Sequence, residues 1–318
     1  MDIEDIKAGV VNGQKRAAAK LITMMENEDS RALDLMKELY HLTGKAKVIG
    51  ITGPPGAGKS TVTDQIAKLI RKQGKNVGII AVDPTSPFSH GAILGDRIRM
   101  NDLNTDPGVF IRSLGTRGAL GGLSNAVYGT VNILDIFGMD YIFIETVGVG
   151  QSEVDIVKVA DVVVMVMVPG LGDDIQTMKA GIMEIGDVFA VNKSDKEGAQ
   201  RTAAEIEAML SFSDKKGKDA PVLNITAKSN DGIDKLLSTI DDCYDNMRSD
   251  GSLTQRSKSK LREKIISILQ SNLVKSALNM DDKTGMLKKL VEDVFDKKID
   301  PYTASTILYK NFKMGDEK

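Results

Sequence analysis

The sequence lacks the features of a secreted or membrane-spanning protein. Its 318 residues include a single cysteine, Cys243, and no tryptophan. One cysteine excludes an intramolecular disulfide framework and is typical of a reducing compartment. The opening residues, MDIEDIKAGV, are acidic and lack the basic-then-apolar order of a signal peptide. No run of about 18 apolar residues is present to cross a bilayer. These absences predict a cytoplasmic protein with no membrane partner.

An excess of charge of either sign is also missing. The chain has 42 lysines and arginines against 44 aspartates and glutamates, which gives a formal net charge of −2. Proteins that bind nucleic acids non-specifically usually carry a basic excess, so no nucleic-acid partner is expected. Apolar residues make up 42% of the chain, which is ordinary for a globular protein with a large core.

Hydrophobic patterning divides the chain into three parts. Residues 1–45 have apolar positions at helical spacing and predict a helical extension. Residues 46–250 alternate short, continuous apolar runs with helical patterns, which predicts an α/β domain with a mostly parallel sheet flanked by helices. The predicted strands are Val48–Ile51, Val77–Val82, Tyr141–Ile144, Val162–Val168, Val188–Val191 and Val222–Ile225.

The third part, residues 251–318, is again helical in pattern and follows a polar boundary at Arg248–Lys258. An apolar stripe at helical spacing is formed by Leu261, Ile265, Ile268, Leu269 and Leu273. Further helices are expected near Met286–Phe295 and after Pro301. The pattern alone leaves two interpretations open, a helical appendage packed on the core or a dimerisation arm.

A glycine-rich loop lies between the first predicted strand and a predicted helix. It matches the pattern G-x-x-x-x-G-K-[ST] at every fixed position. Its residues are Gly53, Pro54, Pro55, Gly56, Ala57, Gly58, Lys59 and Ser60. Glycines let backbone N–H groups wrap around phosphate, and the helix N-terminus adds partial positive charge. Lys59 is expected to bridge the terminal phosphates, Ser60 to bind magnesium through its hydroxyl, and Thr61 to complete the phosphate-binding set. This chain is therefore predicted to be a P-loop NTPase.

The tetrapeptide Asn192-Lys193-Ser194-Asp195 follows the predicted strand Val188–Val191. N-K-x-D is the guanine reader of GTP-binding proteins, in which the aspartate carboxylate accepts hydrogen bonds from the guanine N1–H and 2-amino groups. Adenine has no such donors, so ATP would leave the carboxylate unpaired. Asn192 is expected to bind the other edge of the base or to hold the loop, and Lys193 to lay its stem on the base.

The next predicted strand ends in Thr226-Ala227-Lys228. This is the place of the short loop that backs the base in GTP-binding proteins. The order of the three motifs therefore indicates a protein that binds GTP and GDP and hydrolyses GTP.

Two acidic residues, Asp83 and Glu145, each follow a buried apolar run. A carboxylate at the C-terminal end of a strand faces the nucleotide crevice of a doubly wound sheet and can hold magnesium or one of its waters. Gly148 is expected to donate its N–H to the γ-phosphate. Val149 stands where Ras-like enzymes carry the glutamine that orients the attacking water, so hydrolysis is expected to be slow without a partner.

Four further stretches carry a resemblance to a known family. They are VDPTSPFSHGAILGDRIRM (82–100), IRSLGTRGALGGLS (111–124), ETVGVGQSE (145–153) and PGLGDDIQTMKAGI (169–182). With these stretches and the N-terminal DIKAGVVNGQKRAAAKLITMMEN, the chain resembles the MeaB/ArgK family of P-loop GTPases over nearly its whole length.

The resemblance implies a GTP-dependent chaperone of an adenosylcobalamin-dependent acyl-CoA mutase, most often methylmalonyl-CoA mutase. Such a chaperone gates cofactor loading and protects or reactivates the mutase. The resemblance also implies a homodimer joined through C-terminal helices, which favours the dimerisation arm for residues 251–318.

Carried over position by position, the family pattern makes Asp83, Asp96 and Glu145 the acidic residues around magnesium. The stretch 169–182 matches a third element that couples nucleotide state to the mutase. Within it, Lys179 is the candidate for electrostatic help to the transition state. The expected catalytic residues are therefore Lys59, Glu145 and Lys179.

Two other functions compete with this one. A metallochaperone-type GTPase would be expected to carry a histidine-rich tract or a cysteine pair, and the chain has neither. A small-molecule kinase or transport ATPase would use ATP, which N-K-x-D disfavours. The mutase chaperone remains the favoured interpretation.

Overall fold

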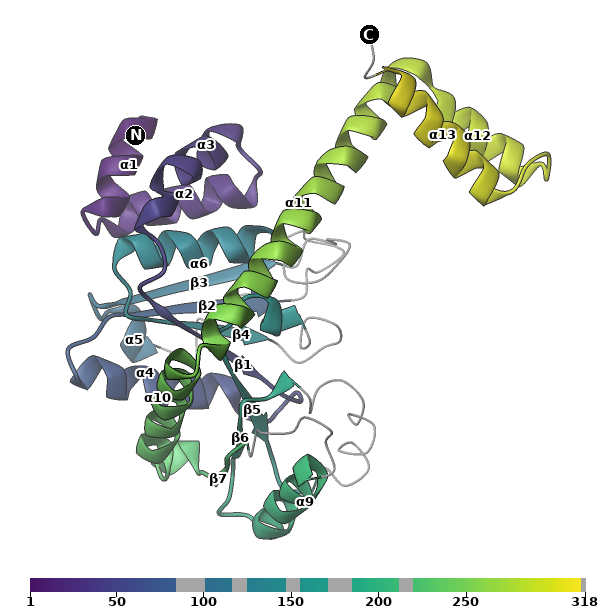
Figure 1. Ribbon diagram of the computed structural model, residues 1–318. Helices are drawn as coiled ribbons and strands as arrows, with labels where there is room; N and C mark the ends of the chain where they lie inside the picture. Colours follow the sequence, from purple (N-terminus) through teal and green to yellow (C-terminus); the bar gives the residue numbers. More distant parts are fainter. Residues whose placement is uncertain (84–100, 116–124, 147–154, 171–184, 212–219, 316–318) are drawn as a thin grey trace. The chain divides into compact units, whose positions relative to one another are not determined.

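A parallel sheet organises the first of two compact units, Met1–Arg256 and Ser257–Lys318 (Figure 1). The computed structural model describes residues 1–83, 101–115, 125–146, 155–170, 185–211 and 220–315. Within these residues the sheet has seven strands in the order β3-β2-β4-β1-β5-β6-β7, and every neighbouring pair is parallel. The predicted fold class is confirmed.

The strands agree closely with the apolar runs of the sequence. Their bounds are β1 Lys47–Thr52, β2 Val77–Asp83, β3 Val109–Gly115, β4 Tyr141–Thr146, β5 Val162–Met167, β6 Val188–Val191 and β7 Val222–Asn224. Every residue of β4, β5 and β6 is buried, as expected for central strands of a sheet that is covered on both faces.

Two helical layers cover the sheet. One face packs against α6 Asn125–Phe137, and α1 Ile3–Val11, α2 Lys15–Glu26 and α3 Ser30–Leu39 pack on α6 in turn. The other face packs against α4 Lys59–Lys72 and α10 Ile233–Ser249, and α9 Ala199–Ser211 adds a smaller core with β5, β6 and β7. Successive residues of one strand alternate between the layers, because Val48 lies in the first core and Ile49 in the second.

Strand β3 is the one strand of the described sheet that the sequence analysis did not predict. Its sequence, VFIRSLG, is interrupted by Arg112 and Ser113, so it lacks the continuous apolar run of its neighbours. The strand lies at the edge of the sheet, where a polar residue can leave the core. Arg112 forms an ion pair with Glu26 of α2. It also donates a hydrogen bond to Oγ1 of Thr23, on the same helix, at 3.1 Å. The N-terminal helices therefore cover this edge.

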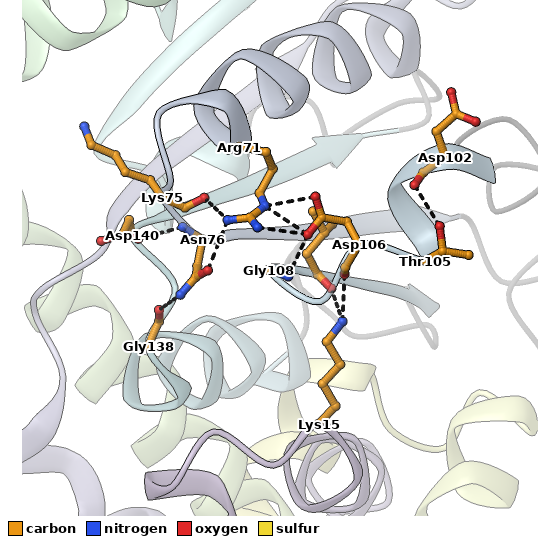
Figure 2. A network of polar contacts seen from close by, with 11 residues as sticks. Lys15, Arg71, Lys75, Asn76, Asp102, Thr105, Asp106, Gly108, Gly138 and Asp140 are labelled. Carbon is orange, nitrogen blue, oxygen red and sulfur yellow. Dashed lines mark hydrogen bonds and ion pairs between the residues drawn. The ribbon is translucent and has the colours of Figure 1, made fainter.

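A polar network lies where β2, β3 and β4 begin, at the edge opposite to the motif loops (Figure 2). The guanidinium of Arg71, near the end of α4, donates from Nε to both carboxylate oxygens of Asp106, at 3.0 and 3.1 Å. This contact holds the pKa of the Asp106 carboxyl below its usual value. Lys15 of α2 donates to the Asp106 carbonyl at 3.0 Å. A Cβ on Gly108 would lie 2.1 Å from Arg71 Cζ, so the guanidinium requires glycine there.

The second unit is helical, as predicted. Its helices are the greater part of α11 Ser252–Thr284, followed by α12 Met286–Phe295 and α13 Pro301–Gly315, which pack on each other. Only two residues, Asp250 and Gly251, separate α10 from α11, so the predicted polar boundary at Arg248–Lys258 is mostly helix. No helix in the described parts of the chain is long and apolar enough to cross a membrane.

Candidate functional site

The motif loops meet at the carboxyl edge of the sheet, because β1 lies between β4 and β5. Glu145 of β4 is in register with Ile51 of β1, and Thr52 is in register with Met165 of β5. Strand β6 follows β5 and ends at Val191, immediately before the N-K-S-D tetrapeptide. A crevice outside the carboxyl ends of parallel strands is the usual ligand site of such sheets.

The glycine-rich loop has a backbone that only glycine adopts easily. Gly53, Gly56 and Gly58 have φ angles of +138°, +75° and +89°. A Cβ on Gly53 would lie 2.1 Å from the carbonyl oxygen of Val166 in β5. Gly58 is the N-cap of α4 and has no side chain to cap the helix. The first N–H groups of α4 therefore remain available to an anion.

Lys59 is folded back over this loop. Its side chain is buried, and its ammonium donates to the carbonyl oxygens of Gly53 at 2.8 Å and Pro54 at 3.0 Å. Pro54 is buried, whereas Pro55 and Thr61 are exposed. A cation held by neutral carbonyl groups can exchange them for phosphate oxygens with a gain in electrostatic energy.

Ser60 and Glu145 connect the loop to β4. The Ser60 hydroxyl donates to Oε1 of Glu145, whose side chain is buried at the end of the strand. Beside this pair, Thr146 Oγ1 donates to Thr52 Oγ1 at 3.0 Å, a link between β4 and β1 that the sequence analysis missed. Thr146 belongs to the stretch 145–153, but Thr52 belongs to none of the motifs, so only the strand order could have identified the contact.

Asn192 joins the two loops that the sequence assigned to phosphate and base. Its Nδ2 donates to the Ala57 carbonyl at 2.8 Å, and its Oδ1 accepts from the Ala227 N–H at 3.0 Å. The side chain is buried. A Cβ on Gly58 would lie 2.5 Å from Asn192 Nδ2, so the loops fit closely. Both the nitrogen and the oxygen of this side-chain amide are bonded to protein backbone. These bonds correspond to the expected role in which Asn192 holds the loop.

The other residues of the tetrapeptide are partly or fully exposed at the carboxyl edge of the sheet. Lys193 has a φ of +61°, and its ammonium donates to the Gly56 carbonyl at 2.8 Å. The Ser194 hydroxyl lies 3.0 Å from Thr226 Oγ1. Asp195 is exposed, so its carboxylate can reach a ligand. Lys228 is also exposed, and Ala227 is buried beneath the loop.

Several predicted residues lie outside the described parts of the chain. They are Asp96, Gly148 and Lys179. Asp83 is described only as the last residue of β2, in register with Gly115 of β3. The described residues hold no group of three or more acidic, histidine or cysteine side chains that could bind a metal by themselves.

This geometry agrees with a comparison against protein-family models. The model described as "Methylmalonyl Co-A mutase-associated GTPase MeaB" matches residues 18–282. The chain belongs to the MeaB family of P-loop GTPases. Nucleotide hydrolysis is the general activity of P-loop GTPases.

Relatives of this MeaB-family chain come from all domains of life. A Pyrococcus abyssi protein is 46% identical over 317 residues, covering 98% of each chain. The mouse protein named "Methylmalonic aciduria type A homolog, mitochondrial" is 30% identical over 330 residues, covering 98% of this chain and 80% of its own length. The GTPase ArgK of Escherichia coli is 34% identical over 252 residues, covering 76% of each.

A solved structure described as a "LAO/AO transport system kinase" has the same fold. It superposes with a TM-score of 0.73 over 98% of this chain and 97% of its own, at 23% sequence identity. HypB from Helicobacter pylori in complex with nickel gives a TM-score of 0.50 over 69% of this chain and 96% of its own, at 16% identity. At these identities the likeness concerns the fold alone.

The close fit between the two loops gives a stability prediction. Gly58→Ala and Gly56→Ala both place an alanine in the left-handed region, at a cost of about 1–2 kcal/mol each. Only Gly58→Ala also meets Asn192, because nothing lies within 4 Å of a Cβ on Gly56. We expect Gly58→Ala to lower the free energy of unfolding by about 1–3 kcal/mol more than Gly56→Ala, as measured by urea unfolding without nucleotide. Equal losses would mean that Asn192 does not hold the loops together.

Proposed function

We propose that this MeaB-family protein binds guanine nucleotides with magnesium at the crevice and hydrolyses GTP there. The observation that carries the proposal is the double hydrogen bond of Asn192, which ties the glycine-rich loop to the loop that begins at Thr226. A phosphate-binding loop and a base-binding loop held at one spacing can bind the two ends of one nucleotide.

The chain supplies distinct groups to each end of that nucleotide. The backbone of Gly53–Thr61 and the N-terminus of α4 surround the phosphates. Lys59 exchanges the carbonyl oxygens of Gly53 and Pro54 for phosphate oxygens, and Asp195 accepts from guanine. The backbone of Thr226–Lys228 supports the base from behind.

The oxygen atoms of Ser60 and Glu145 fit a magnesium ion. Magnesium is usually held by one or two carboxylates, with waters and substrate phosphates completing its octahedron. The hydroxyl of Ser60 already contacts the Glu145 carboxylate, and both face the end of β1. In the proposal Asp83 and Asp96 supply further carboxylates, and Gly148 and Lys179 act near the γ-phosphate. Bound magnesium would neutralise charge on the phosphate oxygens.

The guanine preference is tested at Asp195. Asp195→Asn should weaken GDP binding by about 100-fold, because two hydrogen bonds to a charged acceptor are lost at about 1.5 kcal/mol or more each. The asparagine amide instead offers a donor, so affinity for xanthosine diphosphate, which has an oxygen in place of the 2-amino group, should rise. Calorimetric titration measures both affinities.

The exposed Asp242 of α10 provides the matched control, because its neighbour Asp241 contacts Lys47 at the opposite edge of the sheet. Asp242→Asn makes the same chemical change there and should bind both nucleotides as the unaltered protein does. GDP binding that is unaffected by Asp195→Asn would place the base elsewhere and reject this part of the proposal.

We further propose that the protein is a chaperone of an adenosylcobalamin-dependent acyl-CoA mutase, with methylmalonyl-CoA mutase as the client. The support is the description of the matching family as mutase-associated and the resemblance to the mouse methylmalonic aciduria type A homolog over 98% of the chain. In this role the GTPase cycle gates cofactor loading and protects or reactivates the mutase.

The chaperone role is tested by GTP hydrolysis with and without purified mutase. Because Val149 stands in place of a water-orienting glutamine, the protein by itself is expected to hydrolyse GTP slowly. In other GTPases, a catalytic residue that a partner protein supplies raises the rate by roughly 10³–10⁵-fold. We expect at least about tenfold stimulation by the client mutase. The variant Lys59→Ala should remove the stimulated rate and so exclude a contaminating enzyme. Turnover that no candidate mutase alters would reject the client while leaving the GTPase intact.

We propose that two copies associate through the C-terminal unit. Ile265, Leu269 and Leu273 repeat every four residues on α11, and their exposed fractions are 66%, 55% and 46%. Such a stripe is usually covered by another surface. Ile265→Glu with Leu269→Glu should convert a dimer to a monomer in analytical ultracentrifugation, whereas Gln270→Glu, on an exposed neighbouring position, should not. A monomer before any substitution would contradict the proposal.

A further inference from the structure

An ion pair between a buried carboxylate and a partly buried guanidinium lies at the amino edge of the sheet, directly before β6. The side chain of Asp187 is 3% exposed, and its Oδ2 accepts from Arg256 Nη1 at 2.7 Å. The same oxygen accepts from the Val163 N–H of β5 at 2.9 Å. Arg256 belongs to the first turns of α11, within the Met1–Arg256 unit. The carboxylate of Asp187 therefore joins the first turns of α11, residues 252–256, to two strands. These residues are called the root of α11 below.

Arg256 reaches a third strand through a backbone link. Its Nη1 also donates to the Asp161 carbonyl at 2.9 Å. The Asp161 N–H donates to the Val48 carbonyl at 2.7 Å, and Asp161 Oδ2 accepts from the Val48 N–H at 3.1 Å. Val48 lies in β1, so the contacts of Arg256 extend to the beginnings of β1, β5 and β6.

These three strands lead to the proposed nucleotide site. Strand β1 ends immediately before Gly53, and Asn192 follows β6 and donates its N–H to the carbonyl of Met167, the last residue of β5, at 2.7 Å. Only the four residues of β6 separate Asp187 from Asn192, a span of about 16 Å at the rise of an extended strand. All four are fully buried and paired with β5, and the last three are also paired with β7, so a displacement at one end is carried to the other.

Stability alone is a weak explanation for this pair. When an ion pair is removed from water, the cost of desolvating the two charges is often as large as the attraction between them. Apolar residues of similar volume can therefore often replace such a pair without a loss of folding stability. Such pairs are better suited to fixing one register of packed elements. Here the two fixed elements are β6 and the root of α11. Strand β6 leads directly to the tetrapeptide Asn192–Asp195, which is called the base-reading loop below.

We propose that Asp187 and Arg256 are positioning residues for the base-reading loop, through which bound guanine nucleotide and the docking of the α11 root strengthen each other. The inference rests on the proposed nucleotide site and adds a regulatory connection to it. Coupling of two equilibria is reciprocal, so the factor by which docking raises GDP affinity is the factor by which GDP stabilises docking.

The test combines calorimetric titration with GDP and hydrogen exchange of the backbone amides of residues 252–260. Both are measured at a temperature well below the midpoint of thermal unfolding. In the unaltered protein GDP should slow exchange at this segment. Arg256→Met should weaken GDP binding by at least about fivefold, the lower end of typical coupling factors, and should abolish the effect of GDP on exchange.

Two further variants separate positioning from loss of stability. Asp187→Asn combined with Arg256→Met leaves no buried charge unpaired, so it should fold, and it should show the same loss of GDP affinity. Arg71→Met breaks the Arg71–Asp106 pair at the same edge of the sheet, which joins the end of α4 to the turn before β3 and has no contact with β6 (Figure 2). It should lower stability yet change GDP affinity by less than about twofold.

Unchanged GDP affinity in the double variant, or equal exchange with and without GDP in the unaltered protein, would overturn the inference while the nucleotide site stands. An equal loss of affinity in Arg71→Met would also overturn it, because general destabilisation would then explain the result. Failure of the unaltered protein to bind GDP would instead overturn the proposed function, and the inference with it.

Discussion

The site depends on the placement of β1 between β4 and β5 in parallel register. This arrangement brings the glycine-rich loop at the end of β1 beside Glu145 at the end of β4. It also presses Gly53 against the Val166 carbonyl of β5, a distance that excludes any side chain. Since β6 pairs with β5, the base-reading loop emerges on the same edge, and Asn192 closes the gap to the glycine-rich loop. The loops are therefore held by the sheet, and each loop restricts the other.

The two edges of the sheet carry different kinds of polar group. The carboxyl edge carries the Lys59 ammonium, the uncapped N–H groups of α4 and the exposed carboxylate of Asp195. The amino edge holds charged pairs that are satisfied within the protein, Arg71 with Asp106 and Arg256 with Asp187. These pairs attach α2, α4 and the root of α11 to the beginnings of the strands. Strands β5 and β6 between the edges are fully buried and paired with each other, which is the physical basis of the connection proposed between the edges.

Local sequence patterns predicted most of the elements, because buried parallel strands are continuous β-branched runs and need no distant information. Strand β3 was missed, since Arg112 and Ser113 break its apolar run. Strand order could not be read from the sequence, and the contacts that depend on it were missed with it. The Thr146–Thr52 bond crosses 94 residues, and the Asn192–Ala57 bond crosses 135. The tetrapeptide therefore allowed two roles for Asn192, and the fold supplies the two backbone bonds of the loop-holding role. The C-terminal helices were predicted from the helical spacing of their apolar residues alone.

Competitive titration of the unaltered protein with GDP and ADP, in excess magnesium and again in excess chelator, tests the central claim most directly. If the crevice is a magnesium-dependent guanine-nucleotide site, GDP should bind at least about 100-fold more tightly than ADP, because ADP leaves Asp195 without its donors. Chelation should weaken the binding of a non-hydrolysable GTP analogue, because Ser60 and Glu145 would lose the ion that joins them to the phosphates. Equal affinity for the two diphosphates, or binding of the GTP analogue that does not respond to magnesium, would contradict the account.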